Sequence, residues 1–557
     1  MLNIAKYKRN PVVHYPEREW PDKEIEKAPI WCSVDLRDGN QALVEPMVVE
    51  EKIEFFNMLV KLGFKEIEIG FPAASQIEYD FLRQLVERRL IPDDVRVQVL
   101  VQCREHLIKR TFEAIQGIKK VVVHIYNSTS TLLRDVVFHK NMEEIKQIAI
   151  EGTELVKKYA KDYDGDLMLE YSPESFTGTE LEYALEVCTA VQDTWGEATP
   201  EKPIIFNLPS TVEMNTPNVY ADQIEWMHKH FKNRESVILS VHPHNDRGTG
   251  VAATELALLA GADRVEGTLF GNGERTGNVD ILNIAYNMFS QGIDPKLDIE
   301  NVREIAEVYE RCTKMTIDPR HPYAGKLVFT AFSGSHQDAI NKGLQALHER
   351  NSQYWEVPYL PIDPSDIGRQ YEPIVRINSQ SGKGGVAFVM DTFYGFKLPK
   401  GMHKEFADVI QKISEQQGEV APEQIMEEFR KNYLDKKEPI HFRKCQITDT
   451  ESADGEFATL AKVTYTDHGM EKTFEGVGNG PIDAVQRGLE EALGVQIKVL
   501  DYNEHALNSG SNAQAASYIH LMDKDSGKVT YGVGVSSNIT RSSIRGIFSA
   551  VNRLFFS

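Results

Sequence analysis

Two histidines separated by one residue, His242 and His244, end a β-branched run, and Asp38 follows another such run much earlier in the chain. Side chains at positions i and i+2 of a strand point to the same face, so the two imidazoles converge on one point. A carboxylate from a neighbouring strand end completes a mixed nitrogen and oxygen site that suits Zn²⁺, Mn²⁺ or Mg²⁺. Polar core residues that satisfy one another are the alternative, but the paired spacing favours a divalent metal site.

Two further polar residues are candidates for the same site. Arg37 directly precedes Asp38. It could form a salt bridge with a nearby carboxylate, or it could stabilise negative charge that develops on a metal-bound carbonyl. Asn278 ends the glycine-rich stretch 271–278, which lacks the G-x-G-x-x-G spacing of a dinucleotide loop and follows the last expected strand rather than the first. We therefore expect Asn278 to line the metal site.

The elements that must position these residues are short β-branched runs, which we expect to be strands. They cover residues 31–36, 65–70, 95–101, 119–125, 166–171, 203–208, 236–242 and 263–269. Amphipathic helical stretches lie between them, at 49–62, 77–89, 143–159, 180–193, 218–230 and 250–260. This alternation predicts an α/β fold with a TIM (β/α)8 barrel, and an open doubly wound sheet is the alternative. Polar residues after the strand ends favour the barrel, because barrels place their active sites there.

The pattern changes after the barrel, which we expect to span residues 28–325. Residues 326–435 predict helical connector subdomains, with helices at 335–350 and 402–431 and a loop at the glycines of 382–385. Residues 436–557 hold an internal repeat of two strands and a helix. Its copies begin near Ala458 and Ala516, which predicts a C-terminal α+β domain with a ββα pseudo-repeat.

Composition limits the class of protein. The chain has 557 residues, a formal charge of -21 and 41% hydrophobic residues, which describes a globular protein and disfavours nonspecific binding to nucleic acid. No apolar run has transmembrane length, so we expect no membrane span. Five cysteines without a C-x-x-C pair predict reduced thiols and a cytoplasmic location. Residues 1–27 do not resemble a targeting segment and predict an exposed N-terminal arm.

Four motifs together carry a resemblance to a known family. They are Asp-Leu-Arg-Asp-Gly-Asn-Gln at 35–41, His-Pro-His-Asn-Asp at 242–246, the stretch 271–278 and Phe-Ser-Gly-Ser-His-Gln-Asp at 332–338. With them the chain resembles the 2-isopropylmalate synthase family over nearly its whole length, and the arm at 18–22 resembles the longer branch. The barrel motifs are shared with homocitrate synthase, citramalate synthase and superfamily lyases, whereas the C-terminal repeat is typical of the leucine and citramalate branch.

The resemblance implies a metal-dependent Claisen condensation. Acetyl-CoA would condense with 3-methyl-2-oxobutanoate, and thioester hydrolysis would give 2-isopropylmalate in the first committed step of leucine biosynthesis, with feedback inhibition by leucine. The implied metal ligands are Asp38, His242 and His244, with Asn278 nearby. Metal identity (Mg, Mn or Zn) and activation by K⁺ stay open. Homocitrate or citramalate synthase, a metal-dependent aldolase or lyase, and a ligand-sensing protein without activity are the alternatives.

The resemblance also assigns roles to single residues. Arg37 would support the keto oxygen, Glu174 and His336 would do acid and base work, and Tyr371 would donate a proton. Which of Glu174 and His336 takes the proton stays open; from the residues alone, Glu174 could be a helix N-terminal carboxylate and His336 a surface residue. The residues implied to contact the oxoacid are His124, Ser172, Asn207 and Thr211.

Because His336 and Tyr371 follow the barrel in sequence, the resemblance implies a homodimer with active sites composed from both protomers. Leucine would bind the C-terminal repeat, where glycine loops at helix N-termini would meet its carboxylate. A purely structural dimerisation module is the alternative. The implied regulatory residues are Gly476, Gly478, Gly480, Ala484, Gly532 and Gly534.

Overall fold

The structure, a computed structural model, describes residues 4–331, 333–371, 383–417, 420–434, 436–451, 457–507 and 513–556. The chain forms two compact units. The first consists of Met1–Phe329 with Ile362–Gln370, and the second of Thr330–Pro361 with Tyr371–Ser557. Among the described residues, no helix has the length and hydrophobicity needed to cross a bilayer.

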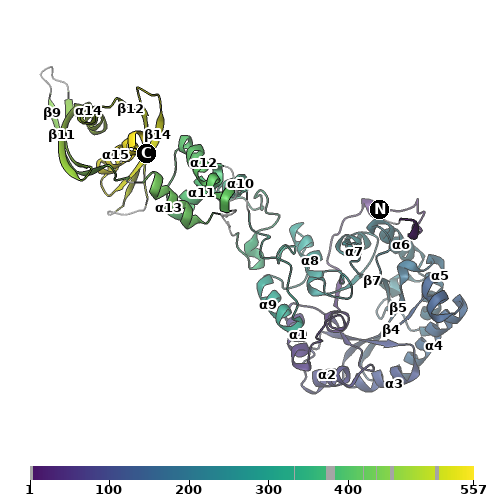
Figure 1. Cartoon of the computed structure of the whole chain (residues 1–557). Helices are drawn as coiled ribbons and strands as arrows, with labels where there is room; N and C mark the ends of the chain where they lie inside the picture. The colour runs from purple at the N-terminus through teal and green to yellow at the C-terminus, as the bar shows by residue number, and fades with distance from the viewer. Residues whose placement is uncertain are drawn as a thin grey trace. The chain divides into compact units, whose positions relative to one another are not determined.

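The first unit is a closed barrel of parallel strands that are hydrogen-bonded in chain order (Figure 1). The strands are β1 (Ile30–Ser33), β2 (Glu66–Gly70), β3 (Arg96–Gln102), β4 (Lys120–Ser128), β5 (Asp166–Glu174), β6 (Ile204–Ser210), β7 (Val237–Pro243) and β8 (Arg264–Gly267). Pairing of β1 with β8 closes the ring. The predicted TIM barrel is therefore confirmed, and an open doubly wound sheet is excluded.

Helices surround the barrel. They are α1 (Val49–Lys61), α2 (Gln76–Glu87), α3 (Glu105–Ala114), α4 (Met142–Ala160), α5 (Leu181–Trp195), α6 (Pro217–His230), α7 (Gly250–Leu259), α8 (Ile281–Ser290) and α9 (Val302–Thr313). Side-chain caps fix several starts: at α4, Asn141 accepts from the Glu144 backbone N–H while the Glu144 carboxylate accepts from that of Asn141. Helices α3, α8 and α9 were not predicted from the sequence, and α3 and α8 have only ten residues each.

Strand β1 is shorter than predicted. The chain leaves it after Ser33 and forms one π-helical turn, η3 (Asp35–Gly39). This turn, rather than the strand itself, carries Asp38 to the end of the barrel at which the other strands also finish. π-helical turns are rare and often mark functional sites.

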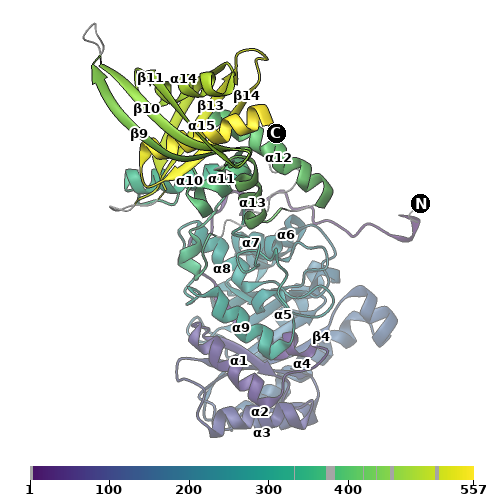
Figure 2. The ribbon, with the colours of Figure 1, turned by 60° about the vertical axis from the view of Figure 1, so that its left-hand side comes forward.

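The described part of the second unit contains four connector helices and two antiparallel sheets (Figure 2). The helices are α10 (Gly334–Arg350), α11 (Lys383–Tyr394), α12 (Lys400–Gln417) and α13 (Pro422–Asn432). The predicted helix 402–431 is therefore two helices, because Pro422 can begin a helix but cannot continue one. The loop expected at 382–385 is also corrected, since α11 begins at Lys383; residue 382 lies outside the described residues.

The C-terminal repeat has three strands per copy rather than two. The first copy consists of β9 (Ile440–Glu451), β10 (Phe457–Asp467), β11 (Met470–Gly478) and α14 (Pro481–Leu493). The second consists of β12 (Ile497–Ala506), β13 (Ala515–Asp523), β14 (Val529–Ser536) and α15 (Ile539–Phe556). The α+β class is confirmed, while the predicted ββα unit is a βββα unit. The first strand of each copy, β9 and β12, was missed; in β12 most side chains are not buried, which leaves little apolar pattern to detect.

Connector helices α11, α12 and α13 share one hydrophobic core with the second sheet. Val389, Phe406 and Phe429 of the helices are fully buried in a cluster with Tyr518 of β13 and Val533 of β14. Removal of the C-terminal sheets would therefore expose the apolar side of the connector helices. Point substitutions, rather than truncations, are the appropriate way to test this unit.

Candidate active site

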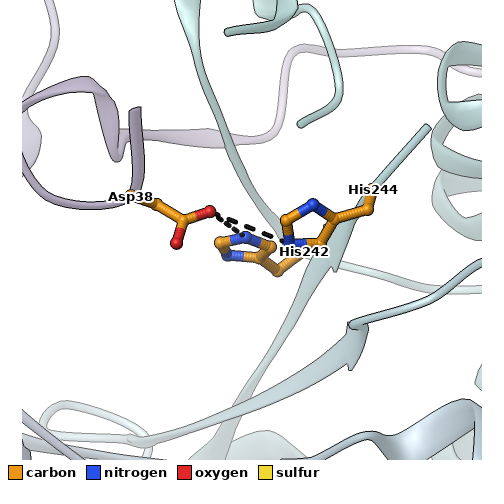
Figure 3. A group of neighbouring side chains, drawn as sticks. All are labelled: Asp38, His242 and His244. Carbon is orange, nitrogen blue, oxygen red and sulfur yellow. Dashed lines mark ion pairs between the residues drawn. The ribbon is translucent and has the colours of Figure 1, made fainter. Parts of the chain in front are cut away.

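Asp38, His242 and His244 form one buried group at the carboxyl end of the barrel (Figure 3). The Asp38 Oδ2 atom lies 3.5 Å from Nε2 of His242 and 3.8 Å from Nε2 of His244. This oxygen is buried and has no hydrogen-bond partner among the described residues. A carboxylate oxygen that faces two imidazole nitrogens is a donor set that fits a divalent cation.

Arg37 and Asn278 border this group, as the sequence predicted. The Arg37 guanidinium donates one hydrogen bond to Asp38 and another to Glu68 of β2. Oδ1 of Asn278 lies 2.9 Å from Nε2 of His242, and its Nδ2 donates to the backbone oxygen of Asn272. Both side chains are thus held in place by contacts outside the group.

Burial and neighbouring charges shift the pKa values of Asp38, His242 and His244 in different directions. Burial disfavours the Asp38 carboxylate, but Arg37 and the two histidines outweigh it and hold the pKa of Asp38 well below its usual range. Burial also disfavours protonated His242, yet the adjacent carboxylates of Asp38 and Glu266 raise its pKa to about 9. Burial and the charge of His242 lower the pKa of His244 to about 4. The carboxylate is therefore ionised at neutral pH, His242 is protonated and His244 is neutral.

A second group of buried ligand-type residues consists of Glu68, His124 and Glu266. The Gln98 amide donates to both of its carboxylates, Arg37 donates to Glu68, and Arg264 donates to Glu266. These carboxylates already accept several hydrogen bonds, whereas Asp38 Oδ2 accepts none. The first group is therefore the better candidate for a cation.

The first group opens into a cavity of about 190 Å³. Its lining includes Arg37, Leu100, Tyr126, Glu174 and Arg275 together with the group itself. The cavity is large enough for a small organic acid beside a cation, and it mixes cationic, acidic and apolar side chains. Such pockets at the carboxyl ends of barrel strands are the usual active sites of this fold.

The residues implied to contact an oxoacid also line this cavity. Nε2 of His124 lies 2.7 Å from the Ser172 hydroxyl, and Nδ2 of Asn207 donates to the same hydroxyl at 3.1 Å. Thr211 follows β6, and its hydroxyl accepts from the backbone N–H of Ser175 at 2.9 Å. The structure thus brings together predicted residues of three neighbouring strands, β4, β5 and β6.

Glu174 ends β5 and also lines the cavity. Its carboxylate accepts a hydrogen bond from the Ser128 hydroxyl, which comes from the end of β4. Glu174 is therefore a strand-end residue directed at the cavity. The alternative of a helix N-terminal carboxylate does not apply, because a strand carries it.

His336 and Tyr371 belong to the second unit. His336 is exposed near the start of α10, and its ring stacks on Tyr359 with 4.1 Å between the centroids. The Tyr371 hydroxyl is buried without a described hydrogen-bond partner, and burial raises its pKa. Part of the motif at 332–338 and of the segment after Tyr371 lies outside the described residues.

The six implied regulatory residues lie in the C-terminal repeat, but most are not in loops. Gly476 and Gly478 lie within β11, and Gly532 and Gly534 within β14. A Cβ atom at any of these four glycines would meet backbone atoms of α14 or α15, so glycine there permits close packing of helix on strand. Only Gly480 lies at a helix start, where an added Cβ would meet nothing within 4 Å, while Ala484 is buried in α14.

Several buried polar residues were not singled out from the sequence. Glu68, Gln98, Glu170 and Glu266 all lie inside the barrel and are fully buried. The available signal was alternation: Glu66 and Glu68 in β2, and Arg264 and Glu266 in β8, repeat at the i, i+2 spacing that identified the histidines. Charged residues at alternate positions of an otherwise apolar strand indicate a polar barrel interior.

Comparisons with known proteins cover nearly the whole chain. Residues 28–308 match the HMGL-like family model, residues 326–391 match "Alpha-isopropylmalate synthase, post-catalytic domain-like", and residues 419–555 match "LeuA allosteric (dimerisation) domain". The chain is 57% identical to a 2-isopropylmalate synthase of Clostridium acetobutylicum, over 98% of this chain and 99% of that protein.

The chain belongs to the 2-isopropylmalate synthase family. A second member, from Agrobacterium fabrum, is 53% identical over 99% of this chain and 98% of its own length. Among solved structures, an HMG-CoA lyase from Brucella melitensis matches at 17% identity and a TM-score of 0.42, covering 52% of this chain and 100% of that chain. The family resemblance inferred from the four motifs is confirmed.

Proposed function

We propose that this chain is a 2-isopropylmalate synthase, which condenses acetyl-CoA with 3-methyl-2-oxobutanoate and hydrolyses the thioester to release (2S)-2-isopropylmalate and CoA. The observation that carries the proposal is the buried group of Asp38, His242 and His244 at the mouth of a cavity of about 190 Å³. Full-length identity of 57% to a relative with that name supports the choice of reaction.

The proposed cation is Mg²⁺, Mn²⁺ or Zn²⁺, held by Asp38, His242 and His244 with Asn278 beside them. When bound, it would supply Lewis-acid polarisation of the 2-oxo group. Arg37 is held by Glu68 and Asp38, and in our proposal its guanidinium stabilises the negative charge that develops on the oxo oxygen. His124, Ser172, Asn207 and Thr211 would form the wall against which the oxoacid is oriented.

Condensation requires a base that removes a proton from the methyl group of acetyl-CoA. Glu174 and His336 are the two candidates, and Tyr371 is the proposed proton donor. Glu174 lines the cavity, whereas His336 and Tyr371 belong to the second unit. We propose a homodimer in which both protomers contribute to each site, and the family model over 419–555, described as a dimerisation domain, supports this assembly.

The reaction is tested by release of free thiol from acetyl-CoA with a panel of 2-oxoacids, with and without a chelator. Release that depends on 3-methyl-2-oxobutanoate and stops with chelator supports the proposal. Release with 2-oxoglutarate or pyruvate instead would indicate a homocitrate or citramalate synthase. Cleavage of a hydroxyacyl substrate without thiol release would indicate a lyase, and no reaction at all would favour a ligand-sensing protein.

The base is identified by exchange of the acetyl-CoA methyl protons with D₂O in Glu174→Gln and His336→Gln. We expect the variant that lacks the base to lose exchange, whereas a variant that lacks only a later acid should retain it. Mass spectrometry of recovered acetyl-CoA measures the incorporated deuterium. Equal exchange in both variants and in the unmodified enzyme would exclude both assignments.

We also propose that the C-terminal repeat binds leucine as a feedback inhibitor. The start of α14 is the suitable place, because Gly480 adjoins open space there. Asp483 accepts a hydrogen bond from the Asn479 backbone N–H and pairs with Arg487, so this helix end presents a carboxylate as well as the helix dipole. An amino acid, which carries both charges, suits such a surface.

Gly480→Val tests leucine binding without disturbing the fold. The φ angle of Gly480 is -178°, an extended conformation that any residue adopts, and a side chain there meets nothing within 4 Å. We expect a higher leucine concentration for half-inhibition with unchanged turnover. Glu471→Val, an exposed change in the same repeat, is the control. Unchanged inhibition in Gly480→Val would place the effector site elsewhere.

A further inference from the structure

Glu266 is a buried carboxylate of β8 that receives hydrogen bonds from several sides. Its Oε1 atom accepts from Arg264 at 2.9 Å and from Gln98 at 2.8 Å. Its Oε2 atom accepts from Asn207 at 3.0 Å and lies 2.8 Å from Nδ1 of His242. Contacts with four side chains therefore hold the Glu266 carboxylate in one orientation.

The two nitrogens of the His242 ring have different partners. Nδ1 faces Glu266, whereas Nε2 faces the candidate cation site, 2.9 Å from Asn278 and 3.5 Å from Asp38. A carboxylate on Nδ1 keeps the proton on that nitrogen. It leaves Nε2 as the atom whose lone pair becomes available when the ring is neutral.

His244 lacks an equivalent arrangement. Its Nδ1 atom is buried and has no hydrogen-bond partner among the described residues. Its Nε2 atom lies 3.8 Å from Asp38. The two histidines of the group are therefore held differently: His242 has a carboxylate behind its ring, on Nδ1, whereas His244 has no described hydrogen-bond partner on that nitrogen.

We propose that Glu266 is a positioning residue that fixes the tautomer and orientation of His242 for a divalent cation. Through Asn207, which also donates to Ser172, it ties this ligand to the wall of the cavity. The inference rests on the cation site of the proposed function and adds a residue to it. Substitution of a carboxylate behind a ligating histidine typically weakens metal binding by about 10- to 100-fold.

A neighbouring glutamate provides a matched control. Glu170 of β5 is also fully buried, but neither of its oxygens has a hydrogen-bond partner among the described residues. Burial and the adjacent charge of Glu266 raise the pKa of Glu170 well above its usual range. Its oxygens lie 3.4 Å from Nε2 of His124 and 3.5 Å from the Arg264 guanidinium, so Glu170→Gln alters a buried barrel carboxylate that has no described contact with His242.

The test is calorimetric titration of the full-length, metal-free protein with Mn²⁺, for the unmodified chain, Glu266→Gln and Glu170→Gln. We expect the Mn²⁺ dissociation constant to rise by about 10- to 100-fold in Glu266→Gln and to be unchanged in Glu170→Gln. Equal constants in all three would overturn the role of Glu266 and leave the cation site intact. No Mn²⁺ binding by the unmodified chain would instead contradict the cation site, and the inference would fall with it.

A second variant and one spectroscopic measurement cover the case in which Glu266→Gln does not fold. Glu266→Asp keeps the negative charge beside Arg264 but is one methylene shorter, so we expect a folded protein with weaker Mn²⁺ binding. In ¹⁵N NMR of the unmodified chain loaded with Zn²⁺, we expect His242 to carry its proton on Nδ1. A proton on Nε2, or Mn²⁺ binding by Glu266→Asp as tight as that of the unmodified chain, would overturn the proposal.

Discussion

The carboxyl end of the barrel, here called the barrel mouth, and the C-terminal repeat both contain residues that were predicted to be functional from the sequence. In the structure these residues make different kinds of contact. At the barrel mouth the predicted residues are polar side chains that face one another, as Asp38 and His242 do. In the repeat most are glycines, and those at 476 and 532 lie in strands that pack against helix backbones. A buried polar cluster is difficult to explain by packing alone, whereas a glycine pattern serves packing and ligand binding equally well.

The largest expected effect is at the barrel mouth. Asp38→Ala and His244→Ala each remove one proposed cation ligand, and loss of several kcal/mol of transition-state stabilisation corresponds to roughly a thousandfold or more in turnover. Thiol release measures this loss, and circular dichroism confirms the fold. His106→Ala, an exposed change on α3, should retain full activity. Normal turnover in Asp38→Ala or His244→Ala would show that the polar cluster of the barrel, like the glycines of the repeat, is explained by packing alone.

The second effect is a pH dependence confined to the barrel mouth. A cation must displace the proton of His242, whose pKa is raised to about 9, so affinity should rise about tenfold per pH unit below that value. Between pH 6 and 8 we expect about a hundredfold tighter Mn²⁺ binding. His244, with a pKa of about 4, is already neutral there and adds nothing. Calorimetry at several pH values measures this, and a flat profile would contradict the assigned charges.

The raised pKa of His242 also determines how the free energy of unfolding of the metal-free protein changes with pH. Because the pKa of His242 is raised on folding from its ordinary value of 6.5, its contribution is fully present below pH 6.5 and is lost as pH rises towards 9. Unfolding by denaturant in the presence of chelator should therefore show the barrel losing stability over this range. His242→Gln should remove that part of the dependence.

The smallest expected effect concerns the repeat. In Gly532→Ala the new methyl group would meet backbone atoms of Gly546 and Ala550 in α15, and overpacking of this kind costs about 1–3 kcal/mol. Gly480→Ala, which meets nothing within 4 Å, should cost little. Denaturant unfolding measures both, and Mn²⁺ binding at the barrel should be unchanged. Equal stability of the two variants would contradict the packing role of the strand glycines.

The sequence was sufficient to predict the barrel and the convergence of Asp38, His242 and His244. Eight apolar runs gave the strands, and the i, i+2 spacing of His242 and His244 required them to share a face. The contacts of Glu266 were not predictable from local pattern. Its hydrogen bonds reach Asn207 on β6 and Gln98 on β3, neither of which is a strand that pairs with β8.

The local sequence pattern also failed to predict helix α11 and strand β12, whose structures depend on tertiary packing. Helix α11 begins with two glycines after Lys383, which reads as a loop, but Val386, Val389 and Met390 are buried in the shared core of the second unit. Strand β12 alternates weakly because it lies at the edge of its sheet and most of its side chains are not buried. In both cases distant contacts outweigh local preference.

The most direct test is an anomalous-scattering crystal structure of the full-length protein with Mn²⁺ and 3-methyl-2-oxobutanoate. We predict a manganese peak in contact with Asp38, His242 and His244, with the oxoacid in the cavity beside it. A peak at Glu68, His124 and Glu266, or no peak within the barrel, would contradict the account.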